Sequence, residues 1–209
     1  MPTRVKICGI TNFEDAEAAV AAGADALGFI LFEGSKRYIP IEAAIRIVGK
    51  LPPFVQTVAV TVNAVKEFTN LGWRKQLKNF GVAQLHGEES PQHVKAVSKY
   101  LPVIKVFAAD TAHTVTPGQY EVAAFMLDTQ TSSHGGTGRV FDWSLAVEFQ
   151  KRIAGKPLVL SGGLNPENVA KAIGTVHPYA VDVASGVEAS PGRKDLAKLR
   201  DFIQICKSL

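Results

Sequence analysis

Two side chains at the ends of apolar segments could transfer protons. Cys8 ends an apolar run that starts at Val5, and Asp128 directly follows the apolar run 125–127. A cysteine with a lowered pKa can act as a base or nucleophile, and apolar surroundings raise the pKa of a carboxyl so that it can donate a proton. The structural alternatives are a small buried cysteine and a turn-capping aspartate. Acid–base catalysis is therefore one of two interpretations of this pair.

Two glycine-containing segments near the end of the chain are suited to binding phosphate. Gly162 and Gly163 follow one apolar run, and Ser185 and Gly186 follow the next. Glycine lets backbone N–H groups approach an anion, and adjacent loops of this kind often hold phosphate in barrel enzymes. Tight turns alone would use the same residues, but glycine in both loops favours a phosphate site.

Arg37 and His86 are candidates for further substrate contacts. Arg37 follows the second apolar run, and its planar guanidinium could hold a carboxylate with two hydrogen bonds, the alternative being an exposed arginine. His86 ends the fourth run and could orient the substrate or merely close the rim. The two cysteines, Cys8 and Cys206, lack the spacing of a zinc site. We therefore expect no metal and interpret Cys206 as structural.

These candidates share one position relative to the elements around them. Eight short runs rich in Val, Ile, Leu and Phe recur along the chain, and each is followed by a turn and then by a helical or polar stretch. The sequence predicts strands at 5–8, 26–31, 55–62, 82–85, 103–107, 124–127, 158–160 and 180–184. Eight strand–helix repeats favour a (β/α)8 TIM barrel over the alternative of an open doubly wound sheet. In such a barrel, residues that follow the strands build the active site.

Local signals support the helices between these strands. Asn12, Ser90 with Pro91, and Asn165 are capping residues that precede segments of helical periodicity. The fifth helix is the weakest, because the segment 111–121 contains Pro and Gly, and it could be a loop. The chain of 209 residues is expected to form one domain, 1–209.

Composition predicts a soluble protein of the reducing cytoplasm. The N-terminus has no pattern of an export signal, and the apolar runs are too short to span a bilayer. The net charge of +4 is spread along the chain rather than gathered into a stripe with aromatic residues. We therefore expect a small-molecule substrate, with no nucleic acid and no membrane partner. The oligomeric state is left open.

Two further features have no single interpretation from sequence. If Cys8 points into the barrel, Lys6 does too, and its ammonium needs a carboxylate such as Asp182. The glycine-containing segment 129–140, which includes His134, has the length of an active-site lid, although a surface loop is the alternative.

Taken together, the motifs resemble a known family. The segments 6–11, 84–87, 127–129, 135–138, 141–143, 161–169, 181–188 and 191–195 are similar to the corresponding motifs of phosphoribosylanthranilate isomerases, in the same order and with similar spacing from Val5 to Phe202. The resemblance implies a TIM barrel of tryptophan biosynthesis that uses no cofactor and no metal. Departures at Ala59 and Thr61, and before Arg37, concern only the wall of the substrate pocket.

The resemblance also implies a reaction and a role for each candidate. The family rearranges N-(5-phosphoribosyl)anthranilate into 1-(2-carboxyphenylamino)-1-deoxyribulose 5-phosphate. Asp128 matches the family's general acid and Cys8 its general base. Arg37 matches the ligand of the anthranilate carboxylate, while the backbone at Gly163, Ser185 and Gly186 would hold the phosphate.

Two rival functions fit the same fold. In a Schiff-base enzyme such as an aldolase, Lys105 on the fifth strand would supply the amine. A catalytically silent barrel could serve as a ligand-binding or scaffold subunit. The presence of both Cys8 and Asp128 argues against the second rival.

Overall fold

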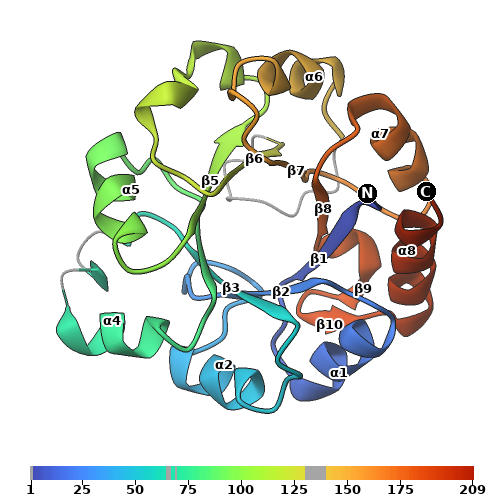
Figure 1. Ribbon diagram of the computed structural model, residues 1–209. Coiled ribbons are helices and arrows are strands. Elements are labelled where there is room, and N and C mark those ends of the chain that lie inside the picture. Colours follow the sequence, from blue (N-terminus) through green and yellow to red (C-terminus); the bar gives the residue numbers. More distant parts are fainter. Residues whose placement is uncertain (1, 65–66, 69, 130–139) are drawn as a thin grey trace.

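The strands close into one parallel barrel in the computed structural model, which describes residues 2–64, 67–68, 70–129 and 140–209 (Figure 1). The barrel strands are β1 (Arg4–Cys8), β2 (Ala26–Ile30), β3 (Gln56–Thr61), β4 (Val82–Leu85), β5 (Val103–Ala108), β6 (Ala124–Asp128), β7 (Leu158–Leu160) and β8 (Ala180–Val183). β1 pairs with β8, with Lys6 opposite Asp182. This pairing confirms the TIM barrel and excludes the open sheet.

Helices form a ring around the strands (Figure 1). They are α1 (Phe13–Ala21), α2 (Ile41–Val48), α4 (Leu71–Leu77), α5 (Pro91–Ser98), α6 (Ser144–Gln150), α7 (Val169–Val176) and α8 (Leu196–Ser208). Between β5 and β6 the chain forms two short 3-10 segments, η1 (Ala112–Thr114) and η2 (Pro117–Gln119). The segment 111–121, where Pro117 and Gly118 weaken the expected fifth helix and leave a loop as the alternative, therefore contains no α-helix. None of the helices built from the described residues has both the length and the apolar character needed to cross a lipid bilayer.

Two of the three predicted capping residues begin their helices as expected, and the third caps the turn before its helix. The side chain of Asn12 accepts a hydrogen bond from the Asp15 N–H at 2.8 Å, and Ser90 accepts one from the His93 N–H. Asn165 caps the turn that leads into α7, since its side chain accepts from the N–H groups of two residues in that turn. Each cap satisfies backbone donors that the helix itself leaves unpaired.

The side chains of each strand alternate between two hydrophobic cores, one beneath the helices and one inside the barrel. Residues such as Ile7, Leu27 and Phe125 face outward and pack beneath the helices. Residues of the opposite parity, such as Val106 and Met126, fill the barrel interior. This interior packing is apolar toward the amino ends of the strands, whereas charged and polar side chains occupy inward positions nearer the carboxyl ends.

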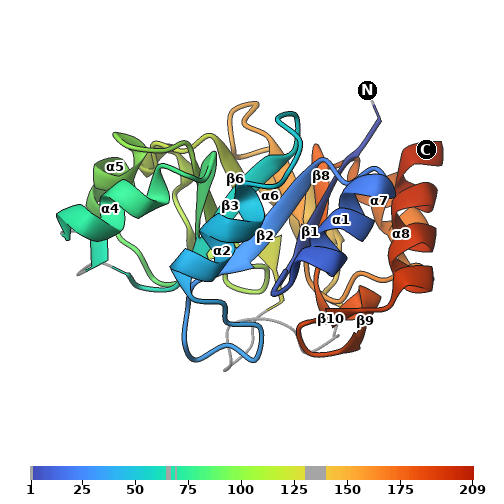
Figure 2. The same cartoon turned by 90° about the horizontal axis from the view of Figure 1, so that it is seen from below.

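A short hairpin follows the last barrel strand and was not expected from the sequence. After β8 the chain forms η3 (Ser185–Val187), β9 (Glu188–Ser190) and β10 (Arg193–Lys194), with β9 and β10 antiparallel. Figure 2 shows this hairpin at the same end of the barrel as the loop that follows β2, while the N-terminus lies at the opposite end. The hairpin therefore adds residues to the rim at the carboxyl ends of the strands.

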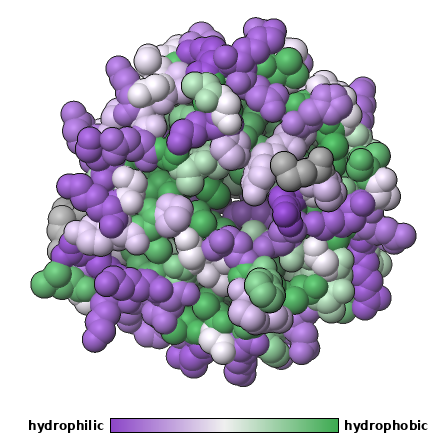
Figure 3. All heavy atoms as spheres, viewed as in Figure 1, coloured by the Kyte–Doolittle hydropathy of each residue, from purple (hydrophilic) through white to green (hydrophobic). Residues whose placement is uncertain are grey.

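The opposite face carries exposed apolar residues. Figure 3 shows this amino-terminal face, where apolar side chains are visible among polar ones. The loops that lead into β3, β5 and β8 contain Phe54, Tyr100 and Tyr179, and Phe54 is 98 % exposed. None of the candidate site residues belongs to these loops.

Candidate active site

Asp128, His86 and Ser161 meet at the carboxyl ends of three strands. Asp128 ends β6, His86 follows β4 and Ser161 follows β7. His86 Nε2 lies 3.5 Å from Asp128 Oδ2, and the Ser161 hydroxyl lies 3.4 Å from the same oxygen. The other carboxylate oxygen accepts the Thr129 N–H at 2.7 Å. Asp128 and His86, which are far apart in the sequence, thus form one polar cluster.

Burial sets the protonation of this cluster. Burial raises the pKa of the Asp128 carboxyl, and the nearby Asp182 adds to the effect, against the opposing influence of His86 and Thr129. Burial also lowers the pKa of His86, which outweighs the attraction of Asp128. Both directions favour a neutral imidazole beside a carboxyl that retains its proton. This is the state that a general acid requires before the reaction.

Cys8 lies inside the barrel mouth above a buried ion pair. The Lys6 ammonium donates to Asp182 Oδ1 at 2.7 Å, and both residues are almost fully buried. Asp182 Oδ2 lies 3.3 Å from the Ser161 hydroxyl, which also contacts Asp128. The question left open by the sequence is therefore settled, because Lys6 points inward and Asp182 is its partner. Burial raises the pKa of the Cys8 thiol, while the positive charge of Lys6 lowers it.

Gly28 is a site residue that the sequence did not identify. It is opposite Cys8 in the register of β1 and β2. A Cβ atom at Gly28 would lie 2.8 Å from the Cys8 Sγ and 3.0 Å from the Lys6 Nζ. The missing side chain therefore makes the space that these two groups fill. Only the strand register could have shown this.

Arg37 is held differently from the expectation. We expected its guanidinium to face a substrate with two free donors, but Nε and Nη2 donate to the Glu188 carboxylate at 2.9 and 2.7 Å. Lys194 Nζ lies 3.2 Å from the same carboxylate and donates to the Cys8 carbonyl oxygen at 2.6 Å. The hairpin thus ties the loop after β2 to the end of β1. Glu188 and Lys194 were not singled out individually, although both lie in segments that carried the family resemblance.

The two glycine loops lie against each other, as a shared phosphate site would require. Gly162 and Gly163 have φ angles of 89° and 66°, a region that favours glycine. A Cβ atom at Gly186 would lie only 1.9 Å from the Leu164 carbonyl oxygen. Because of this close approach, Ser185 and Gly186 at the start of η3 are adjacent to the loop after β7.

Lys105 does not lie with these residues. Lys105 and Phe107 lie two residues apart on β5, so their side chains face the same side of the barrel wall. The Phe107 ring packs against Phe125 and Phe149 beneath the helices. The Lys105 ammonium donates to Glu89 Oε2 at 2.9 Å and to the Gly87 carbonyl oxygen at 2.6 Å. An amine engaged in this way outside the barrel interior is not available to a carbonyl substrate. The geometry therefore argues against the Schiff-base rival.

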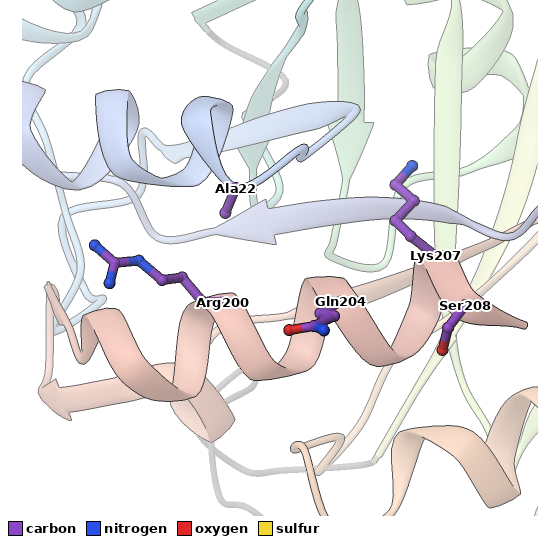
Figure 4. A pocket seen from close by; sticks show the side chains of 5 residues that line it. All are labelled: Ala22, Arg200, Gln204, Lys207 and Ser208. Atoms are coloured by element: carbon purple, nitrogen blue, oxygen red, sulfur yellow. The ribbon is translucent and has the colours of Figure 1, made fainter.

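Other expected or possible features lie outside this cluster. His134 and nearly all of the predicted lid 129–140 are outside the described residues. Among the described residues, no group of His, Cys, Asp and Glu could hold a metal ion. Figure 4 shows a pocket on the outer surface, lined by Ala22 after α1 and by Arg200, Gln204, Lys207 and Ser208 of α8. None of the candidate site residues lines this pocket.

Comparison with known proteins identifies a family. Residues 5–205 match the family described as N-(5'phosphoribosyl)anthranilate (PRA) isomerase. The N-(5'-phosphoribosyl)anthranilate isomerase of Citrifermentans bemidjiense is 50% identical over 99% of this chain and 98% of its own length. The crystal structure of phosphoribosyl anthranilate isomerase from Thermotoga maritima has a TM-score of 0.88 at 45% identity, covering 99% of this chain and 100% of that one. A further isomerase structure, in complex with reduced 1-(o-carboxyphenylamino)-1-deoxyribulose 5-phosphate, has a TM-score of 0.84 at 43% identity, with 99% and 100% covered.

Proposed function

Since the chain belongs to the family of N-(5′-phosphoribosyl)anthranilate isomerases, we propose that it uses Asp128 as general acid and Cys8 as general base. The reaction is the conversion of N-(5′-phosphoribosyl)anthranilate into 1-(2-carboxyphenylamino)-1-deoxyribulose 5-phosphate, the third step of tryptophan synthesis from chorismate. The observation that carries the assignment is the hydrogen-bonded group of Asp128, Ser161, Asp182 and Lys6, which joins the buried acid to the surroundings of Cys8.

The first step opens the sugar ring. Asp128 gives its proton to the ring oxygen, the bond from C1′ to that oxygen breaks, and the nitrogen lone pair forms an iminium. The raised pKa of Asp128 supports this role, because the carboxyl still carries a proton at a pH where an exposed aspartate has lost it. Neutral His86, with Nε2 3.5 Å from Asp128 Oδ2, would help to orient the sugar.

The second step removes the C2′ proton. The Cys8 thiolate takes this proton, and the electron pair of the C–H bond neutralises the iminium to give an enolamine. Tautomerisation then yields the ketone. Carbon C2′ is oxidised while C1′ is reduced within one molecule, so the reaction belongs to the intramolecular oxidoreductase class and balances without a cofactor.

The remaining candidates bind the two ends of the substrate. Glu188 takes Nε and Nη2 of Arg37, so Nη1 is the guanidinium nitrogen that would meet the anthranilate carboxylate. The backbone at Gly162, Gly163, Ser185 and Gly186 would surround the phosphate with N–H donors. We place the enzyme in the cytoplasm, where the free thiols of Cys8 and Cys206 would stay reduced.

Turnover of phosphoribosylanthranilate, generated in place and followed by the loss of its fluorescence, tests the assignment. We expect turnover by the parent chain and its loss in Asp128→Asn and in Cys8→Ser, with ligand binding retained. A silent binding subunit would behave the same with and without both substitutions. A folded parent chain with no turnover would refute the proposed function.

A further inference from the structure

Lys6 has a position that a purely structural ion pair does not need. It lies two residues before Cys8 on β1, so both side chains point into the barrel. Its ammonium is held at 2.7 Å by Asp182, which is directly opposite in the pairing of β1 with β8. The Lys6 and Asp182 side chains are 4% and 7% exposed. The charge is therefore fixed in place and little screened by water.

The ammonium is also a direct neighbour of the Cys8 sulfur. A Cβ atom at Gly28 would lie 3.0 Å from Lys6 Nζ and 2.8 Å from Cys8 Sγ. The two atoms thus share one small space above Gly28. A cation beside a thiol favours the thiolate, which is the form that acts as a base.

Three charged groups face the sulfur from the surrounding strands: Lys6 from its own strand, Asp182 from β8 and Lys194 from β10. Lys194 lies on the carbonyl side of Cys8, and its ammonium is committed to the Cys8 and Ala184 carbonyl oxygens and to Glu188. Asp182 opposes the thiolate but is neutralised by Lys6. On β2, Gly28 contributes no charge. Lys6 is therefore the cation best placed to act on the sulfur.

We propose that Lys6, held by Asp182, is a positioning residue that stabilises the thiolate of Cys8. Before the sugar binds, the thiol loses its proton to solvent while Lys6 keeps its own. The thiolate then accepts the C2′ proton and becomes a neutral thiol, with the electron pair of the C–H bond passing to the enolamine. The burial that raises the pKa of Cys8 is thereby partly offset. The catalytic use of this thiolate rests on the proposed function, whereas its stabilisation by Lys6 does not.

Alkylation of Cys8 by iodoacetamide measures the thiolate without substrate. Cys206→Ala leaves Cys8 as the only cysteine of the chain, so mass spectrometry can follow its modification against pH. In this background, Lys6→Met should reduce the thiolate fraction at neutral pH by about tenfold. Alkylation should slow by less, only several-fold, because the thiolate of a less acidic thiol is intrinsically the better nucleophile. Lys6→Arg, which keeps the charge, should restore most of the rate.

Two further variants keep the test decisive. Lys95→Met removes an exposed lysine of α5 that pairs with Glu121, and should leave the pH dependence of alkylation unchanged. If Lys6→Met leaves Asp182 unpaired and the chain does not fold, Lys6→Met with Asp182→Asn removes both charges. The double variant should also shift alkylation to higher pH, but less than Lys6→Met.

The outcomes separate this inference from the proposed function. Alkylation with the same pH dependence in the parent, Lys6→Met and the double variant would overturn the role of Lys6. A shift in alkylation together with the same shift in the pH profile of kcat/KM supports both proposals. A shift in alkylation with an unchanged turnover profile supports the stabilisation of the thiolate by Lys6 but refutes Cys8 as the base.

Discussion

Arg37 and Glu188 are joined across the rim of the barrel by a two-pronged ion pair, with Nη2 2.7 Å from Oε2 and Nε 2.9 Å from Oε1. Arg37 comes from the loop after β2, and Glu188 begins the hairpin after β8. Both residues are buried. The pair fixes the plane of the guanidinium and so determines which of its nitrogens can meet a ligand.

Glu188→Gln should weaken substrate binding more than it slows the chemistry. The amide keeps the size of the side chain but loses the charge-assisted hydrogen bonds, which are worth about 1.5–3 kcal/mol. We expect KM to rise about tenfold and kcat to change less than about threefold, measured by steady-state kinetics. Glu148→Gln, which removes an exposed pair with Lys151, is the matched control. An unchanged KM in Glu188→Gln would show that Arg37 does not depend on this partner.

Asp128→Asn should stabilise the fold at neutral pH while it abolishes turnover. Burial raises the pKa of Asp128 in the folded state. At pH values between the unfolded pKa of about 3.9 and the higher folded pKa, the folded chain therefore binds more protons than the unfolded chain. The free energy of unfolding therefore falls as pH rises through this window. Asparagine does not ionise and avoids the loss. Thermal unfolding should give a higher Tm for the variant at neutral pH and a smaller difference in acid; a lower Tm at every pH would contradict this.

Glu89→Ala should strongly destabilise the chain. Glu89 is buried, pairs with Lys105 at 2.9 Å and accepts the N–H groups of Asn63 and Gly87. Removing it leaves a buried ammonium without its partner, which costs about 3–5 kcal/mol. Chemical denaturation should show this loss. Glu121→Ala, which removes an exposed pair with Lys95, should cost less than about 1 kcal/mol, and equal losses in the two variants would argue against the effect of burial.

Gly28→Ala should disturb the site directly. The added methyl group would meet Cys8 and Lys6 at 3.0 Å or less, and such overpacking costs about 1–3 kcal/mol. We expect kcat to fall at least about tenfold, because even a small displacement of a catalytic group is costly. Gly174→Ala on α7, where a Cβ atom meets open space, should instead add about 0.5–1 kcal/mol of stability. A fully active Gly28→Ala would show that the sulfur can move without consequence.

The barrel could be predicted from the sequence because its strands carry their own signal. The strands at 82–85 and 158–160 have the predicted bounds, and β1 and β6 differ from prediction by one residue. Continuous apolar runs bounded by turn residues identify strands that are covered by helices on one side and by the core on the other. Because Lys6 lies two residues before Cys8 on the same strand, the alternation of side chains also predicted that Lys6 points inward and needs a carboxylate partner.

The contacts between distant segments could not be predicted in this way. Glu188 lies 151 positions from Arg37 and begins a strand of three residues, too short to leave a periodic pattern. Gly28 matters only because the register of two strands places it directly opposite Cys8. Such relationships depend on how the barrel closes, which local residue preferences do not specify.

The seam between the first and last barrel strands has a consequence for biosynthesis. During synthesis the ribosome releases Lys194, which binds the Cys8 carbonyl oxygen, 186 positions after Cys8. At about 5–20 residues per second, the nascent chain spends on the order of ten seconds or more with the edges of β1 and its partner sheet unpaired. Unpaired edges are templates for association with other chains. The closing strand and hairpin therefore complete the catalytic centre and remove this hazard in the same event, so chains that stall before residue 180 should be both inactive and prone to aggregate.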